Sequence, residues 1–176
     1  MAQFVNYKKR SIDLPPGCKD LMDVLNPASR RSPTGWLAGK RLELVKHEEH
    51  SAGLLSDIGK HLTRVLQSRA QVSALCVSTK DNRTVLEIAH EREGAMAAYG
   101  TFPKDAAKGQ AAKAFLDRYG FHPSQFSGTS VSFSSLFPLA PKTPLLAKLA
   151  VDLFSELGGL GEKSEVQFRY LELRSA

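Results

Sequence analysis

The histidines near residue 50 are the side chains whose types and spacing come nearest to a metal site. His47 and His50 stand at positions i and i+3, so one turn of helix would let them share an ion with a third ligand from elsewhere in the chain. The sequence between them, HEEH, has neither of the metalloprotease spacings HExxH and HxxEH. His61 would lie about 16 Å beyond His50 along a helix that rises about 1.5 Å per residue, too far to join them. We therefore predict no bound metal and no cofactor, and name His47 and His50 as the candidate ligands of any metal site.

The sequence contains no recognisable motif for nucleophilic catalysis or for nucleotide binding. Residues 128–132, GTSVS, have a serine where the GxSxG elbow requires its second glycine, and the segment alternates like a strand. Neither a phosphate-binding GxxxxGK loop nor a GxGxxG loop occurs. We therefore predict no catalytic residue. An enzyme with a pocket near His47, His50 and Trp36 remains an alternative.

The clearest indication of a partner is the positive charge near the N-terminus. Residues 1–46 hold nine Lys and Arg against four Asp and Glu, a surplus of +5 in a chain whose net charge is +6. Basic side chains neutralise phosphates and aromatic rings stack on bases, so this segment contains the ingredients of a nucleic-acid site. The candidate residues are Lys8, Lys9, Arg10, Arg30, Arg31, Trp36, Lys40 and Arg41. The same charges would equally suit an exposed strand edge or keep the protein in solution.

The element that we expect to position any site is a β-hairpin at residues 72–91. Two runs rich in β-branched residues flank residues 80–83, KDNR, whose Asp and Asn tolerate the backbone of a tight turn. If Thr79 lies opposite Thr84, side chains alternate so that one face, which we predict to be the core, holds Leu75, Val77, Leu86 and Ile88. The other face holds Ala74, Cys76, Ser78, Val85, Glu87 and Ala89, small and mixed enough to be half-exposed or covered by another element.

Apolar periodicity predicts the remaining elements. Helical spacing indicates helices at 18–25, 48–70, 101–119 and 143–157, and alternation indicates strands at 4–14, 40–45, 129–137 and 165–173. The helix at 101–119 is expected to turn Ala107, Ala111, Ala114 and Phe115 toward its neighbours. Residues 92–100 are predicted to be irregular. The chain is therefore predicted to be a single α+β domain, residues 1–176, with an antiparallel or mixed sheet of about six strands around the hairpin and helices mainly on one face.

Composition favours a cytoplasmic protein with no membrane contact. The chain has no run of eighteen apolar residues and no signal-peptide pattern at its N-terminus. Its two cysteines, Cys18 and Cys76, stand in apolar patterns and not in a metal-binding pair, which predicts buried free thiols in a reducing compartment.

Because no catalytic set is recognisable, we expect a non-catalytic binding or assembly module. Its partner would be an unknown protein or a second copy of the chain, docked on the second face of the hairpin together with aromatic residues of the late strands. Nucleic-acid binding through the basic N-terminal residues is the first alternative. An unrecognised enzyme with a histidine-containing pocket is the second.

Overall fold

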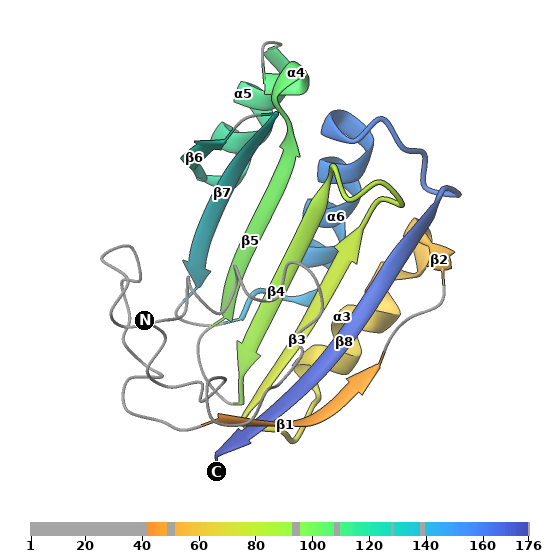
Figure 1. The fold of residues 1–176 in the computed structure, drawn as a ribbon, viewed down its shortest axis with the longest axis vertical. Coiled ribbons are helices and arrows are strands. Elements are labelled where there is room, and N and C mark those ends of the chain that lie inside the picture. Colours follow the sequence, from red (N-terminus) through yellow and green to blue (C-terminus); the bar gives the residue numbers. More distant parts are fainter. Residues whose placement is uncertain are drawn as a thin grey trace.

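An antiparallel sheet organises the part of the chain that the structure describes (Figure 1). The computed structural model describes residues 42–48, 52–92, 96–107, 110–127, 129–137 and 140–175. The strands are β1 (Leu42–Glu48), β2 (Ala52–Leu54), β3 (Val72–Ser78), β4 (Val85–Glu91), β5 (Met96–Pro103), β6 (His122–Ser127), β7 (Ser130–Phe137) and β8 (Glu165–Ser175). They lie in the order β1-β8-β3-β4-β5-β7-β6, and β2 also pairs with β8. Every pairing is antiparallel. The α+β prediction with an antiparallel sheet is confirmed.

The central hairpin has the register that the sequence predicts. Leu75 lies opposite Ile88 and Val77 opposite Leu86. The turn is closed by the Thr79 amide, which donates to the Thr84 carbonyl at 3.0 Å. The Asp81 carboxylate accepts from the Thr79 hydroxyl at 2.6 Å and from the Arg83 amide at 3.1 Å, and Asn82 takes the positive φ of 55°. These bonds satisfy the polar groups of the turn and fix the register of both strands.

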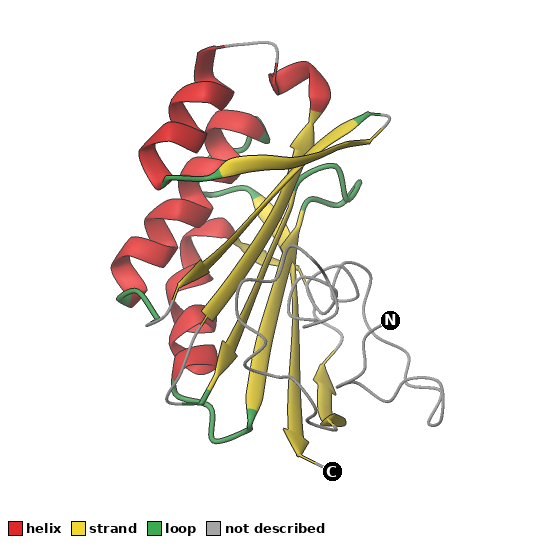
Figure 2. Cartoon of the chain, turned by 90° about the vertical axis from the view of Figure 1, so that its left-hand side faces the viewer, coloured by secondary structure: helices red, strands yellow, loops and turns green. Residues whose placement is uncertain are grey.

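The helices cover one face of the sheet (Figure 2). They are α3 (Ile58–Leu66), α4 (Lys104–Ala107), α5 (Gln110–Tyr119) and α6 (Thr143–Asp152), with a 3-10 turn, η1 (Leu55–Asp57), before α3 and a π-helical turn, η2 (Leu153–Leu157), after α6. Each long helix buries an apolar stripe against the sheet, made in α3 of Ile58, Leu62 and Val65. The predicted stripe of α6 and η2 is confirmed, since Leu146, Leu149, Ala150, Leu153 and Leu157 are all buried. Among the described residues, no helix combines the length and the apolar character that crossing a bilayer requires.

The long helix predicted over residues 48–70 is wrong in its first part. Glu48 ends β1, and β2 pairs with the start of β8, where Gly53 lies opposite Val166. A Cβ on Gly53 would come 2.9 Å from the Phe168 ring, so any larger residue at this position would force the ring or the strand to shift. The helix itself therefore begins at Ile58, after β2 has completed the edge of the sheet.

The prediction of an irregular segment over residues 92–100 is wrong for residues 96–100, because Met96–Pro103 forms β5; residues 93–95 lie outside the described residues. The small residues of β5 make room for an aromatic ring, since a Cβ on Gly100 would overlap the ring of Phe133. The predicted helix at 101–119 consequently begins later, and is divided into α4 and α5. A strand that the periodicity did not indicate, β6, contains Pro123 and lies at the edge of the sheet, where proline is tolerated.

Helix α5 turns a different side toward the sheet than its alanine pattern predicts. Its buried residues are Ala112, Phe115 and Leu116. Ala111 and Ala114 are exposed, so the prediction is wrong for both and right for Phe115. The Phe115 ring lies 5.8 Å from that of Phe133 and 6.3 Å from that of Phe121. Burying a large ring removes more apolar area from water than burying two methyl groups, and this decides the rotation of the helix.

Candidate functional site

The nucleic-acid candidates predicted from the sequence lie outside the described residues. This holds for Lys8, Lys9, Arg10, Arg30, Arg31, Trp36, Lys40 and Arg41, and also for His50 and Cys18. His47 lies in β1, where its backbone is paired with Leu171 of β8. Within the described ranges, no three His, Cys, Asp or Glu side chains are close enough together to hold a metal ion. Cys76 is a buried free thiol, as predicted.

An apolar pocket between the end of α5 and the start of α6 is the most distinctive cavity in the described part of the chain. Its volume is about 280 Å³. Its lining residues are Arg118, Tyr119, Phe137, Pro141, Leu145, Leu146, Lys148 and Leu149. Most of these side chains are apolar, and Leu145 is 52% exposed although it is a large hydrophobic residue. Leu145 therefore adds exposed apolar surface at the rim of the cavity.

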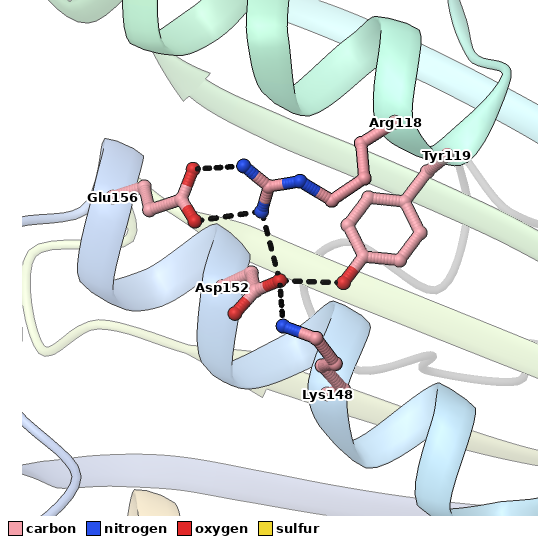
Figure 3. A network of polar contacts seen from close by, with 5 residues as sticks. All are labelled: Arg118, Tyr119, Lys148, Asp152 and Glu156. Carbon is pink, nitrogen blue, oxygen red and sulfur yellow. Dashed lines mark hydrogen bonds and ion pairs between the residues drawn. The ribbon is translucent and has the colours of Figure 1, made fainter.

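The side of this pocket toward Glu156 is held by a polar network that joins α5 to α6 (Figure 3). The Asp152 Oδ2 atom accepts from Arg118 Nη1 at 3.0 Å, from Tyr119 Oη at 2.6 Å and from Lys148 Nζ at 2.9 Å. The Arg118 guanidinium also donates to both carboxylate oxygens of Glu156, at 2.7 and 3.4 Å. A single carboxylate oxygen therefore fixes three side chains that line the pocket.

The protonation state of Asp152 follows from these contacts. Burial by itself would raise the pKa of Asp152, but the donors on Lys148, Tyr119 and Arg118 outweigh it and lower the pKa below its ordinary value. Burial and the hydrogen bond to Asp152 raise the pKa of Tyr119. The hydrogen bond to Glu156 raises the pKa of Arg118. Near neutral pH Asp152 is therefore ionised, Arg118 is a cation and Tyr119 is a neutral phenol.

This arrangement does not suit Asp152 to general-base catalysis. An ionised carboxylate with three donors on one oxygen is a poor base, because a proton transfer to it would have to break those bonds. The network instead clamps the two helices and holds Arg118 and Lys148 over the pocket. Each of these two cations already faces a carboxylate, and the rest of the pocket lining is mainly apolar.

A second cavity, of about 340 Å³, adjoins the hairpin turn and has a polar lining. Here Lys80 lies 2.7 Å from Glu165 at the start of β8, both side chains being largely exposed. The Asp81 carboxylate is occupied by the bonds that close the turn. The ion pair links the hairpin turn to β8, although an exposed pair of this kind contributes little to stability.

The network between α5 and α6 was missed by sequence reasoning. In the sequence, the network is indicated only by three charged residues at a spacing of four, which are Lys148, Asp152 and Glu156. The same spacing is the ordinary pattern of a solvated helix face. Nothing in the sequence indicates that Arg118 and Tyr119, thirty-four and thirty-three residues away from Asp152, would meet it. No family model, curated protein or solved structure matches this chain.

Proposed function

We propose that this chain is a non-catalytic protein-binding module, and that the pocket between α5 and α6 receives an apolar side chain of a partner segment. The observation that carries the proposal is Leu145, which is 52% exposed beside a cavity with a mainly apolar lining. The cavity, at about 280 Å³, is slightly below the range of about 300–1,000 Å³ that encloses drug-sized ligands. It has the size of an anchor site for one or two side chains.

The outer side of α5 supports the same proposal. Ala111 and Ala114 are exposed and lie on the same side of the helix as Arg118, at the pocket. Small side chains allow another backbone to approach closely. A partner segment that lies along α5 would therefore meet little obstruction before its anchor reaches Leu145.

The test uses short random peptides displayed on phage, selected against the folded full-length protein. We expect enriched peptides that share a large apolar residue and that bind the Leu145→Arg variant about tenfold or more weakly, as for the loss of an interface hot spot. The matched control is Leu54→Arg, since Leu54 is the other exposed large hydrophobic residue among the described ones, at 43%. Peptides that bind wild type and Leu145→Arg equally would overturn the proposal.

Nucleic-acid binding is the second candidate, and it is supported by the charge surplus of +5 in residues 1–46. It predicts binding to single-stranded RNA or duplex DNA that weakens steeply as salt is raised. Reversing Lys8, Lys9 and Arg10 to Glu would abolish that binding, while Leu145→Arg would leave it unchanged. For the compartment we propose the cytoplasm, since Cys76 is a free thiol and free thiols persist in reducing surroundings.

A further inference from the structure

The cavity of about 340 Å³ beside the hairpin turn, which we call the turn cavity, is enclosed by four separate parts of the chain. These parts are the hairpin turn, the end of β5, the loop after η2 and the start of β8, and they lie at one end of the sheet (Figure 1). The lining residues are Thr79, Lys80, Asp81, Arg83, Thr84, Pro103, Gly158, Leu160 and Glu165. None of them lines the pocket between α5 and α6, so the two cavities are separate.

The two main walls of the turn cavity are held by backbone hydrogen bonds. The hairpin wall is fixed by the bonds that close the turn. On the opposite wall, the Gly158 amide donates to the Leu153 carbonyl at 3.1 Å and the Leu160 amide donates to the Phe154 carbonyl at 2.9 Å. The first of these two bonds closes the π-helical turn η2, and such turns are frequent at functional sites. The cavity is therefore formed before any ligand enters it, as most small-molecule sites are.

Thr84 brings a buried hydroxyl to the turn cavity. Only 1% of this residue is exposed. Its amide donates to the Thr79 hydroxyl at 3.2 Å, and its carbonyl accepts from the Thr79 amide at 3.0 Å. Within the described part of the chain, all hydrogen bonds of Thr84 are made by its backbone, so its hydroxyl has no protein partner there. A buried hydroxyl without a partner is costly, and a ligand in the cavity would supply one.

Gly158 leaves the Thr84 hydroxyl uncovered. A Cβ at Gly158 would come 3.2 Å from Thr84 Oγ1 and 2.7 Å from the carbonyl oxygen of Phe154. The second contact is with backbone, which cannot swing aside as the end of a flexible side chain does. A larger residue at this position would therefore distort η2 and cover the hydroxyl, whereas glycine keeps the hydroxyl accessible from the cavity.

The charges around the turn cavity leave one cation available to a ligand. The Asp81 carboxylate is occupied by the Thr79 hydroxyl and the Arg83 amide. Lys80 is paired with Glu165, but both side chains are exposed, so this pair is easily exchanged for a ligand. The guanidinium of Arg83 forms no ion pair with any described residue. A guanidinium matches two oxygens of a carboxylate or a phosphate, and this favours an oxyanion as the ligand.

We propose that the turn cavity binds the oxyanion group of a small organic ligand, a carboxylate or a phosphate monoester, through the guanidinium of Arg83 and the hydroxyl of Thr84. Pro103 and Leu160 give the organic part of the ligand an apolar wall. The volume lies near the lower end of the range of about 300–1,000 Å³ for ligand pockets, so the ligand is small. The proposal does not depend on the pocket between α5 and α6.

The test is an NMR titration of the isotope-labelled full-length protein with three probes of similar size. Benzoate carries a carboxylate, phenyl phosphate carries a phosphate monoester, and benzyl alcohol carries the same ring without a charge. We expect at least one of the two anions to shift the amide signals of Gly158 and Leu160, and the tighter of the two identifies the oxyanion. Benzyl alcohol should leave these signals in place. Equal binding of all three probes at these amides, or no shift there with either anion at millimolar concentration, would overturn the proposal.

Three variants assign the binding to the named side chains. Arg83→Gln should weaken the bound anion about tenfold or more, as for the loss of a charged hydrogen-bond partner. Thr84→Val keeps the shape of the side chain, so it should weaken binding while leaving the thermal unfolding of the free protein nearly unchanged. The matched control is Arg69→Gln, which removes the same charge from an exposed residue at the opposite end of β3 and should leave the affinity unchanged. Equal weakening by Arg83→Gln and Arg69→Gln, or unchanged affinity in Thr84→Val, would contradict the proposed site.

Discussion

The hydroxyl of Tyr119 donates to Asp152 Oδ2 at 2.6 Å, and this bond joins the last residue of α5 to the last residue of α6. The two side chains are thirty-three residues apart in the sequence, and the same carboxylate oxygen also binds Arg118 and Lys148. The pocket beside them is thus shaped by a contact between helices and not by either helix alone.

Replacing Asp152 by Asn should destabilise the protein. The amide keeps the shape of the side chain but lacks the charge that Arg118 and Lys148 share, and Asp152 is only 13% exposed. We expect a loss of about 1–3 kcal/mol in the free energy of unfolding, as for the loss of a hydrogen-bonded charged partner. Urea unfolding measures it. The control is Asp117→Asn on the exposed side of α5, which should change the stability by less than about 0.5 kcal/mol.

The contribution of Asp152 should disappear in acid. Its pKa in the folded protein is lowered from the ordinary value of 3.8. A lowered pKa stabilises the fold above the unfolded-state pKa, and the stabilisation is lost as the pH falls through the folded-state pKa. The difference in unfolding free energy between wild type and Asp152→Asn should therefore be constant from about pH 5 to 7 and shrink below about pH 4. A difference that grows on acidification would contradict the assignment.

The hairpin could be predicted from sequence because its determinants are local. A polar turn joins two runs of alternating apolar residues, and the register follows once Thr79 lies opposite Thr84. The start of α3 could not be predicted in this way. Residues 52–54 form a strand and not a helical turn because they pair with β8, more than a hundred residues later. Tertiary pairing overrides local propensity in such cases.

The candidate site is even harder to predict from the sequence, for the same reason. Helix periodicity shows which residues of α5 share a side, but not which side meets the sheet, and the buried ring of Phe115 decides this. In this orientation the side chains of Arg118 and Tyr119 reach α6, while Ala111 and Ala114, on the same side of α5 as Arg118, stay exposed. The alanine pattern of α5 alone therefore does not determine which side of the helix packs on the sheet.

Two glycines on different elements should respond in opposite directions to alanine. A Cβ at Gly100 would overlap the Phe133 ring, so Gly100→Ala should cost about 1–3 kcal/mol, as overpacking does. A Cβ at Gly59 in α3 meets nothing within 4 Å, so Gly59→Ala should stabilise by about 0.4–1 kcal/mol by restricting the unfolded chain. Thermal unfolding of both variants checks the pair. Equal effects would mean that the contact with Phe133 does not constrain β5.

The thiol of Cys76 should react at a rate that reports how the sheet opens on the face that points away from the helices. Cys76 is 2% exposed in a strand paired on both sides, opposite Glu87 and Arg169. In a Cys18→Ser background we expect an aromatic disulfide reagent to label Cys76 far more slowly than an exposed cysteine introduced as Lys113→Cys. If a local opening exposes the thiol, the labelling rate should depend little on denaturant at low concentration, because a local opening exposes less surface than global unfolding does. A rate that rises from the first addition of denaturant with the full slope of unfolding would show that only separation of the strands exposes Cys76.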